Sequence, residues 1–323
     1  MRKIKWGVLG TANIAKGHTI PGMIKADNCE LYAIAGRSLE KAEAFKETFG
    51  FKKAYGSYMD LLEDPEVEAV YIPLPNNLHK EWAIKAAQHK KHILCEKPLS
   101  GNPDDVKNII DVCDKEGVIL MEAFAYLHSP LIDKIKEQIN TGVIGDVNFI
   151  ESCFYTPGYE ENIRIHRETL GGSIYDLGCY NITFATALFG EMPVEAKAVA
   201  HFSKNGIDET STGYLLFNDD KKAVFSCAMH PYSRGDRTFV YGKEGIIEIP
   251  VAFNAEGVQK WYVVKGNERT EYSVDIPDNY MLEVEQLGRC ITDGESPLVS
   301  HEFSIGYAKT MKELLDSCGY NIQ

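Results

Sequence analysis

The sequence predicts an α/β half with a doubly wound parallel sheet, followed by an α+β half with a large, mostly antiparallel open sheet. Two observations carry this prediction. Short apolar runs alternate with helical patterns up to residue 122, and beyond residue 130 several alternating segments follow one another without intervening helices. The first pattern is typical of parallel sheets and the second of antiparallel ones. We therefore expect two domains, residues 1–122 and 123–323.

The first half contains five apolar runs with strand character and three segments with helical periodicity. The expected strands are 5–9, 30–35, 69–72, 92–95 and 118–121, and the expected helices are 39–49, 79–89 and 103–116. This regular alternation indicates a nucleotide-binding domain.

The second half begins with one helix, a strand and another helix, continues as a run of strands, and ends with two helices. The expected helices are 131–141, 174–188, 278–292 and 301–317, and the expected strands are 147–155, 195–203, 210–217, 222–230, 237–241, 246–251 and 259–264. Because an antiparallel sheet needs cover for its second face, we expect a homodimer or a homotetramer.

Composition restricts the partners. The formal charge of the 323 residues is -13, which argues against nucleic acid and against an anionic membrane surface. No stretch reaches the roughly 18 to 20 apolar residues of a membrane span, and the chain moves straight into a strand, so we expect a cytoplasmic protein. The eight cysteines are scattered and no third ligand accompanies His89 and His92, so we expect reduced thiols and no metal.

The segment from Gly7 to Ala15 follows the first strand and opens a helix. It matches the dinucleotide fingerprint GxGxxG/A, with Gly10 at the tight turn and Ala12 in place of the second glycine. A cofactor would therefore sit slightly farther out or rely on amides at the helix N-terminus. The residues expected to contact the cofactor here are Gly10, Thr11, Ala12, Asn13 and Ile14. The first half is thus predicted to be a Rossmann domain.

The end of the second predicted strand distinguishes NADP from NAD. An acidic residue there would bind the ribose 2'-hydroxyl of NAD, whereas an arginine accommodates the 2'-phosphate of NADP. The chain has Arg37 and Ser38 and no acid at this position, so we expect NADP, with NAD as the alternative. The competing interpretation is a surface arginine followed by Ser38 as a helix N-cap.

Lys97 follows the strand 92–95 and an acid, Glu96, and precedes Pro98. Ligands of open α/β sheets bind beyond the carboxyl ends of the strands, so this lysine is predicted to face a ligand. Glu96 either positions Lys97 or contacts the nicotinamide end of the cofactor. The alternative is that both are solvated loop charges. The sequence leaves open whether the bond before Pro98 is cis.

A third segment, Gly171 to Tyr180, gives a glycine entry into a helix. Asp176 and Tyr180 are four residues apart and would project from one helix face. Each alone has an ordinary structural explanation, because Asp176 suits a helix start and Tyr180 suits half-buried packing. Together with a strand-end lysine, they are candidates for acid and base chemistry.

With these motifs in order, the chain resembles the glucose-fructose oxidoreductase/inositol dehydrogenase (Gfo/Idh/MocA) family over nearly its whole length. The segments that carry the resemblance are Gly10 to Ala15, Tyr71 to His79, Cys95 to Pro98, Met121 to Phe124 and Gly171 to Tyr180. Tyr180, where many members have histidine, is similar to the branch of dimeric dihydrodiol dehydrogenase and NADP-dependent D-xylose dehydrogenase. Two departures are Leu127, where relatives tend to have arginine, and Ser173, which replaces a third glycine.

The resemblance implies hydride transfer between NADP and a secondary alcohol or hemiacetal carbon of a sugar, polyol or cyclic diol. It also implies that several further residues line the two binding sites. Those on the cofactor side are Leu74, Pro75, Asn76, His79, Glu96 and Lys97, and those on the substrate side are Phe124, Asn162, Arg164, Asp176 and Tyr180.

Proton chemistry suggests roles for the catalytic candidates Lys97, Tyr180 and Asp176. Free tyrosine and lysine both titrate at about 10, too high for a base at neutral pH, but a cationic lysine would stabilise a tyrosine phenolate. We expect Tyr180 to exchange the proton, Lys97 to be its partner and Asp176 to orient the pair; the reverse assignment of Lys97 and Tyr180 stays open. The alternative functions are a redox-neutral glycosidase or epimerase with tightly bound NAD(P), and a non-catalytic sugar or nucleotide sensor.

Overall fold

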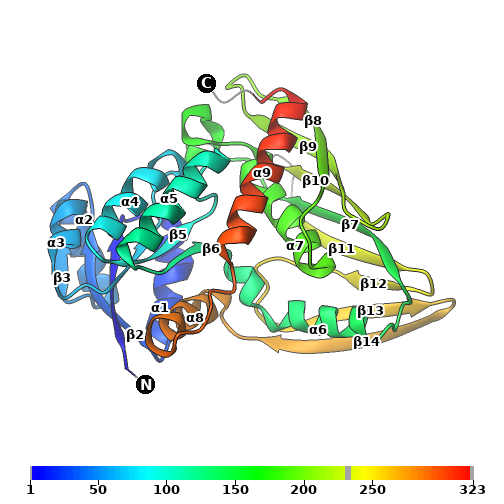
Figure 1. The fold of residues 1–323 in the computed structure, drawn as a ribbon, viewed down its shortest axis with the longest axis horizontal. Coiled ribbons are helices and arrows are strands. Elements are labelled where there is room, and N and C mark those ends of the chain that lie inside the picture. The colour runs from blue at the N-terminus through cyan, green and yellow to red at the C-terminus, as the bar shows by residue number, and fades with distance from the viewer. Residues whose placement is uncertain (1, 230–233, 321–323) are drawn as a thin grey trace. The chain divides into compact units, whose positions relative to one another are not determined.

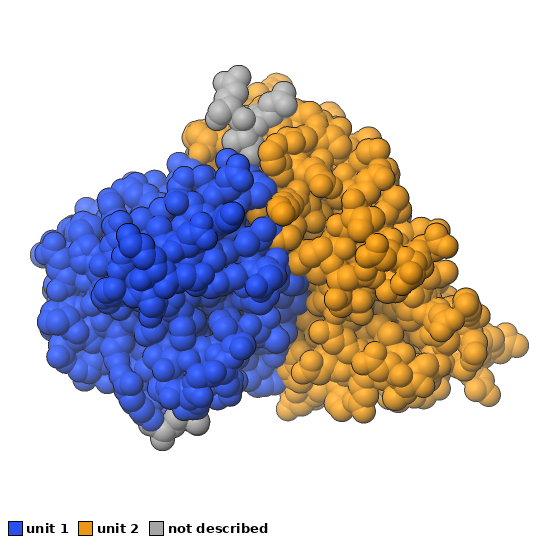
Figure 2. Space-filling view, viewed as in Figure 1, with its two compact units in different colours: residues 1–128, 277–305 blue, residues 129–276, 306–323 orange. Residues whose placement is uncertain are grey.

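The computed structural model describes residues 2–229 and 234–320, and these form two compact units (Figure 2). Unit 1 comprises Met1–His128 and Pro277–Ile305, and unit 2 comprises Ser129–Ile276 and Gly306–Gln323. The units differ from the predicted domains 1–122 and 123–323 because a segment near the carboxyl end returns to unit 1. Among the described residues, no helix is both long and apolar enough to cross a membrane.

Unit 1 is built on a six-stranded sheet in which every neighbouring pair is parallel (Figure 1). The strands are β1 (Ile4–Leu9), β2 (Cys29–Ala35), β3 (Lys53–Tyr55), β4 (Ala69–Ile72), β5 (His92–Glu96) and β6 (Leu120–Ala123), in the order β3-β2-β1-β4-β5-β6. This order reverses between β1 and β4, which is the position where doubly wound sheets bind ligands. The predicted fold class is confirmed for this half.

Four of the six helices described in unit 1, namely α2, α3, α5 and α8, begin at a residue whose side chain caps them. They are α1 (Ile20–Lys25), α2 (Leu39–Phe49), α3 (Tyr58–Glu63), α4 (His79–Gln88), α5 (Pro103–Glu116) and α8 (Asn279–Asp293). The side chain of Asn102 accepts the amide of Asp104 at the start of α5, and Gly117 ends the helix with φ 68°. Left-handed backbone of this kind favours glycine, so the expected bounds of α5 were correct.

Helix α8 explains why the segment 277–305 belongs to unit 1. It packs against α1, β2 and β5, and Figure 1 shows it beside α1. Gly22 permits this contact, because a Cβ atom at that position would lie 2.7 Å from the backbone nitrogen of Met281. The Asn28 side chain donates to the carbonyl of Glu285 at 2.8 Å, which joins α8 to the residue just before β2.

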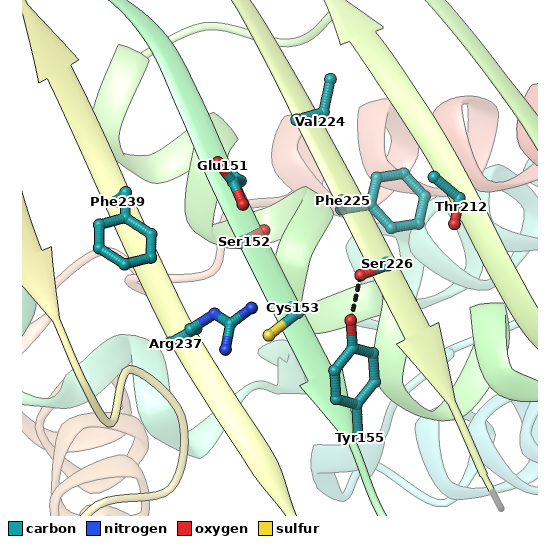
Figure 3. A pocket seen from close by; sticks show the side chains of 10 residues that line it. All are labelled: Glu151, Ser152, Cys153, Tyr155, Thr212, Val224, Phe225, Ser226, Arg237 and Phe239. Carbon is teal, nitrogen blue, oxygen red and sulfur yellow. Dashed lines mark hydrogen bonds between the residues drawn. The ribbon is translucent and has the colours of Figure 1, made fainter. Parts of the chain in front are cut away.

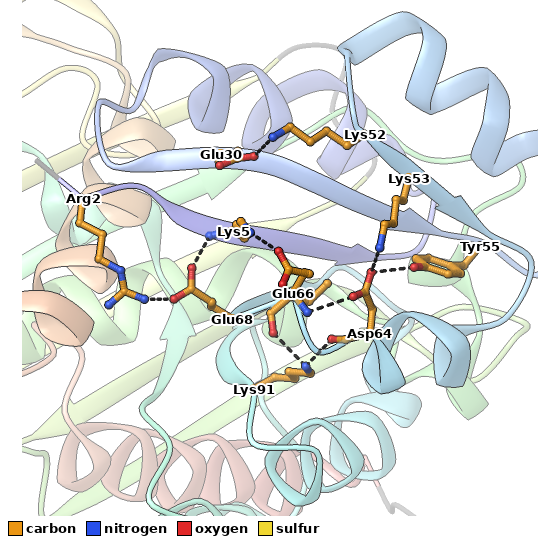
Figure 4. A network of polar contacts seen from close by, with 11 residues as sticks. Arg2, Lys5, Glu30, Lys52, Lys53, Tyr55, Asp64, Glu66, Glu68 and Lys91 are labelled. Carbon is orange, nitrogen blue, oxygen red and sulfur yellow. Dashed lines mark hydrogen bonds and ion pairs between the residues drawn. The ribbon is translucent and has the colours of Figure 1, made fainter.

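A network of paired charges lies at the amino ends of the parallel strands (Figure 4). Lys5 on β1 donates its backbone amide to Glu68, which precedes β4 and also pairs with Arg2. Buried Lys91, just before β5, donates to the carbonyl oxygens of Asp64 and Val67 at 2.7 and 2.8 Å. The polar groups at this edge therefore bind one another. Their hydrogen bonds and ion pairs join the amino ends of β1, β4 and β5.

Unit 2 contains an eight-stranded sheet in the order β14-β13-β12-β11-β7-β10-β9-β8. Its strands are β7 (Val147–Tyr155), β8 (Glu195–Phe202), β9 (Asp208–Leu216), β10 (Lys222–Ala228), β11 (Gly235–Gly242), β12 (Ile246–Ile249), β13 (Gly257–Lys265) and β14 (Glu268–Ile276). All neighbouring pairs are antiparallel except β7 with β10, so the prediction of a mostly antiparallel sheet is confirmed. The strand expected over 222–230 ends at Ala228, and His230 lies outside the described residues.

Three helices complete the described part of the chain: α6 (Pro130–Asn140), α7 (Cys179–Phe189) and α9 (His301–Cys318). Helix α7 is mostly buried and packs on β7 and β10. A π-helical turn, Ile174–Gly178, leads directly into α7. The core of unit 2 therefore lies between α7 and the face of the sheet that carries Phe154, Phe225 and Cys227.

The opposite face of this sheet carries a shallow groove (Figure 3). Its lining includes Cys153 and Tyr155 of β7, Ser226 of β10 and Arg237 of β11. Tyr155 Oη and Ser226 Oγ are hydrogen-bonded at 2.5 Å. Since side chains alternate between the faces of a strand, Phe154 points to the core and its two neighbours point into the groove.

Candidate active site

The first predicted cofactor element is the turn after β1. Gly10 has φ 129°, which L side chains rarely adopt, and a Cβ atom there would lie 3.2 Å from Leu74 Cδ2. Its amide donates to the carbonyl of Ala35 on β2 at 2.8 Å. Thr11 and Ala12 form the turn, and Asn13 and Ile14 begin the helical segment that continues as a π-helical turn, Ala15–Thr19, into α1. A helix N-terminus of this kind presents amides that suit a pyrophosphate.

The second element is the end of β2. Arg37 is exposed and forms no ion pair within the described ranges, so its guanidinium is available to a ligand. Ser38 caps α2, because its Oγ accepts the amide of Lys41 at 3.5 Å. The capping interpretation of Ser38 is therefore correct, and it leaves Arg37 as the cationic side chain at this strand end.

The third element is the loop after β4, where Leu74, Pro75, Asn76 and His79 lie. His79 is fully buried, and its ring nitrogens face the carbonyl oxygens of Leu74 and Pro98, both at 2.8 Å. Burial lowers the pKa of His79 below its usual value. His79 thus ties the loop after β4 to the turn that follows Lys97.

Lys97 lies directly after β5, and the peptide bond between Lys97 and Pro98 is cis. The preceding Glu96 accepts the hydroxyl of Tyr71 at 2.5 Å, and the Tyr71 oxygen accepts Thr19 Oγ1 at 2.8 Å. Tyr71 was part of a quoted motif but had no predicted role. The structure shows that it fixes the carboxylate next to the candidate lysine.

Two further acids are buried near this strand end. Glu122 of β6 is 2% exposed, accepts the amide of Leu99 at 2.8 Å, and is coupled electrostatically to Lys97. Burial raises the pKa of Glu122 to about 7. Glu283 of α8 is 1% exposed, and burial raises its pKa well above the usual value. Glu122 lay in the motif Met121 to Phe124, as an acid inside an apolar run, but it was given no predicted role.

Phe124, predicted on the substrate side, is buried in unit 1. Its side chain is 1% exposed, and its ring lies 6.2 Å from that of Phe303 in an edge-to-face arrangement. The structure therefore shows a packing role for this residue, and its contact with substrate stays a prediction.

In unit 2, the glycine segment before α7 is closely packed. A Cβ at Gly171 would lie 2.3 Å from the carbonyl oxygen of Arg164. Gly172 has φ 125°, and a Cβ there would lie 1.9 Å from Asp208 Oδ1. The glycines thus permit close approach of backbone and carboxylate, and this entry to the helix is fixed in place.

Asp208 of β9 holds the start of the helical segment. Its Oδ2 accepts Ser173 Oγ and the amide of Ile174, both at 2.7 Å, and Ser211 Oγ at 2.9 Å. Asp208 is fully buried, which raises its pKa to about 6. Ser173, noted as a departure from the family pattern, is therefore the residue that binds this carboxylate. Asp208 gave no signal for this role in the sequence, because an acidic residue at the start of a strand is not part of a recognisable motif.

Asp176 lies in the π-helical turn and is engaged on both carboxylate oxygens. Arg164 Nε lies 2.7 Å from Oδ1, and Tyr159 Oη donates to Oδ2 at 3.3 Å. Asn162 begins the turn Ile163–Ile165 and accepts the amide of Arg164 at 3.1 Å. The structure thus brings together three predicted residues, Asn162, Arg164 and Asp176. The partner of Arg164 in this group is the carboxylate of Asp176.

Tyr180 lies in the first turn of α7 and is half-buried. Its ring lies edge-on to Phe154 at 5.2 Å and tilted against Phe253 at 5.5 Å. The Tyr180 oxygen accepts Asn254 Nδ2 at 3.3 Å. Asn254 is 74 positions away in the sequence and carried no signal, since it follows an ordinary strand end.

Comparison with known proteins assigns the family. The family model "Oxidoreductase family, NAD-binding Rossmann fold" matches residues 4–124, and the model "GFO/IDH/MocA C-terminal domain" matches residues 132–248. The chain belongs to the GFO/IDH/MocA oxidoreductase family. The resemblance expected from the motifs of this oxidoreductase is therefore confirmed.

Relatives match this oxidoreductase along almost its full length. A D-xylose 1-dehydrogenase (NADP(+)) from Haloferax volcanii is 35% identical, covering 97% of this chain and 96% of the relative. A trans-1,2-dihydrobenzene-1,2-diol dehydrogenase from Xenopus laevis is 32% identical and covers 98% of both chains. The crystal structure of a 3-ketoreductase from Actinomadura kijaniata with NADP and TDP-benzene has a TM-score of 0.92 at 26% identity, with 98% of both chains covered.

Proposed function

We propose that the chain transfers a hydride between NADP and a secondary alcohol or hemiacetal carbon of a sugar, polyol or cyclic diol. The observation that carries this proposal is Lys97 directly after β5, at the carboxyl edge of a parallel sheet, in a chain of this oxidoreductase family. Ligands of doubly wound sheets bind at that edge. The named activities of the relatives, on D-xylose and on a dihydrodiol, support substrates with neighbouring hydroxyl groups.

The residues at the ends of β1 and β2 fit NADP. Gly10 allows a close turn that a Cβ would obstruct, and exposed Arg37 suits a 2'-phosphate, where NAD-specific sites carry an acid. A relative named for NADP and a similar structure containing NADP support the same cofactor. NAD remains the alternative.

Replacement of Arg37 tests the cofactor proposal. Arg37→Asp should weaken NADP binding by about a hundredfold, because it removes a charge-assisted contact and adds a repulsive charge, while NAD binding changes little. Fluorescence titration of both cofactors measures this ratio. Lys107→Asp, on the exposed face of α5, makes the same change of charge and is the matched control. An unaltered NADP affinity in Arg37→Asp contradicts the assignment.

Bound NADP supplies a nicotinamide ring that accepts the hydride from the substrate carbon. The chain's own residues handle the proton: Tyr180 Oη accepts it from the substrate hydroxyl, and the Lys97 ammonium stabilises the phenolate that accepts it. Asp176, which forms an ion pair with Arg164, orients Tyr180. In the opposite reaction Tyr180 returns the proton to the carbonyl oxygen.

Lys97→Met is the experiment that tests the proposed function. The variant should lose turnover by at least about a thousandfold while binding NADP nearly as the parent does, because the side chain keeps its length and loses its charge. The assay is NADPH formation over a panel of pentoses, hexoses, inositols and cyclic diols. Lys85→Met on α4, whose ammonium pairs with Glu81 and lies over the ring of Trp82 on the same helix, is the control.

The same assay, with glycosides added to the panel, also separates the alternatives. Unchanged turnover in Lys97→Met contradicts the proton-transfer role. Product release from a glycoside without net NADPH would indicate the redox-neutral use of bound cofactor, and ligand binding without turnover in the parent would indicate a sensor. Either result would replace the proposed reaction.

We also propose that the chain forms a homodimer or homotetramer through the grooved face of the eight-stranded sheet. That face exposes hydrophobic and aromatic side chains such as Val224 and Phe239, and α7 covers only the other face. Antiparallel sheets with an apolar outer face are commonly covered by a partner. Light scattering should report at least two chains, and a monomer at micromolar concentration would contradict the proposal.

A further inference from the structure

The loop between β12 and β13 reaches the phenol of Tyr180. Asn254 in this loop has φ 49°, a left-handed conformation that asparagine tolerates better than most residues. Its side-chain amide donates to Tyr180 Oη at 3.3 Å. The loop thus contributes a polar group to a tyrosine whose nearest rings are apolar.

A buried carboxylate fixes the path of this loop. Asp236 of β11 is 9% exposed and accepts the amides of Ala252 and Phe253 at 2.9 and 3.1 Å. Arg234 donates to Asp236 Oδ2 at 2.9 Å and to the carbonyl of Phe253 at 2.7 Å. Three hydrogen bonds therefore hold the two residues that precede Asn254, so its position is set by the sheet.

Phe253 adds an apolar contact to the same loop. Its side chain is fully buried, and its ring lies 5.2 Å from Phe154, 5.5 Å from Tyr180 and 5.6 Å from Phe184. Phe154 and Phe253 therefore both pack against the tyrosine ring. With the ring packed against this pair, the phenol oxygen has a fixed direction, and the next residue along the loop is the one that reaches it.

We infer that Asn254 is a positioning residue for Tyr180, which holds the phenol oxygen and stabilises the phenolate by an N–H···O bond. This inference rests on the proposed role of Tyr180 in proton transfer. In the oxidation, the substrate hydroxyl proton passes to Tyr180 Oη as the hydride leaves the carbon for the nicotinamide. A donor to the oxygen favours its anionic form, so the amide helps the tyrosine to begin each cycle as a base.

The other charged groups near Tyr180 have opposing effects on its phenol, so a hydrogen-bond donor can still favour the phenolate. Arg164 attracts the Tyr180 phenolate, while Asp176, on the same helical segment as Tyr180, repels it. These two side chains form an ion pair at 2.7 Å, so their effects on the phenol largely offset each other. Tyr159 donates to Asp176, and Arg234 pairs with Asp236 behind the loop. Asn254 supplies a directed donor at the oxygen itself.

Two substitutions at Asn254 separate the effect of the side-chain amide from the effect of the backbone conformation. Asn254→Gly keeps the left-handed backbone and removes the donor, and Asn254→Asp keeps the shape and places a carboxylate beside the phenol. Asn254→Gly should lower kcat about tenfold with little change in KM, and it should raise the apparent pKa of the base in the kcat profile by about 1. Asn254→Asp should lower kcat about a hundredfold and raise that pKa further.

The matched control is Asn218→Asp, in which the changed amide donates to Glu191 on the surface. Its kcat and pH profile should equal those of the parent, and NADP affinity should be unchanged in all three variants. A kcat profile of Asn254→Asp that superimposes on that of the parent overturns the inference. If Tyr180→Phe keeps full turnover, the proposed role of Tyr180 in proton transfer is wrong; if Tyr180→Phe is inactive but both Asn254 variants are normal, only the present inference fails.

Discussion

Lys97 in unit 1 and Tyr180 in unit 2 have opposite surroundings. Lys97 follows a carboxylate fixed by Tyr71 and is coupled to the buried Glu122. Tyr180 is packed against aromatic rings and accepts a hydrogen bond from Asn254. Acidic neighbours favour a cation, and a donor favours a phenolate. Each residue thus has at least one neighbour in its own unit that favours its charged form.

This difference supports one of the two possible proton assignments. If Lys97 were the base it would have to be neutral, which the carboxylates around it oppose. If Tyr180 is the base it must be a phenolate, which the hydrogen bond from Asn254 favours. We therefore prefer Tyr180 as proton acceptor and Lys97 as its cationic partner.

The largest effect is expected from Tyr180→Phe. The substitution keeps the ring that packs between Phe154 and Phe253 and removes the oxygen, so folding should be preserved while kcat falls about a thousandfold. Steady-state kinetics with the best substrate, together with circular dichroism, measures both. A loss of less than about tenfold would instead favour Lys97 as the base.

A smaller effect, on stability, is expected from Gly172→Ala. The new Cβ would meet Asp208 Oδ1 at 1.9 Å, and φ 125° strains any L side chain, so we expect the free energy of unfolding to fall by about 3 kcal/mol. Urea denaturation measures the change. NADP binding, which depends on unit 1, should survive while kcat falls.

Gly190→Ala is the control for Gly172→Ala. Gly190 ends α7 with φ 72° and has open space where a Cβ would be placed, so only the backbone cost of about 1 kcal/mol applies. Equal losses of unfolding free energy in the two variants would show that contact with Asp208 contributes nothing to stability. Asp208 would then not support the helical segment that leads to Tyr180.

The smallest effect concerns the pH dependence of stability at Glu122. Its folded pKa of about 7 is above the unfolded value, so the folded state binds more protons and stability falls as pH rises from about 4.5 to 7. Glu122→Gln removes this contribution. The difference in unfolding free energy between variant and parent should move by about 2 to 3 kcal/mol in favour of the variant between pH 5 and pH 7.5. A constant difference across that range contradicts the shift.

Sequence patterns predicted the elements that carry their own local signals. The expected bounds of α2 were correct because Ser38 caps its start and Gly50 ends it. Strand β14 was missed because most of its side chains are exposed and polar, so it lacks an apolar alternation. The helix expected to open after Gly10 is present, but its bounds were not predicted because Gly17, Pro21 and Gly22 interrupt its pattern, and Gly22 is required by contact with α8.

In the candidate site, too, the sequence predicted only the residues that carry local signals. Lys97, Asp176 and Tyr180 belong to short motifs whose spacing is visible in the sequence. Their supports come from far away: Asp208 binds the start of the helical segment, and Asn254 reaches the phenol. Such contacts depend on which strands become neighbours, and a single sequence contains no spacing rule for that.

Helix α8 affects how the protein can be made. Unit 1 is not continuous in the chain, because it needs residues 277–305 to cover α1. During synthesis the amino-terminal segment leaves the ribosome first and normally folds first. Here it must wait for nearly the whole chain before its last helix can dock. A fragment ending at His128 would therefore expose the apolar surface around Gly22 and would lack the helix that completes unit 1.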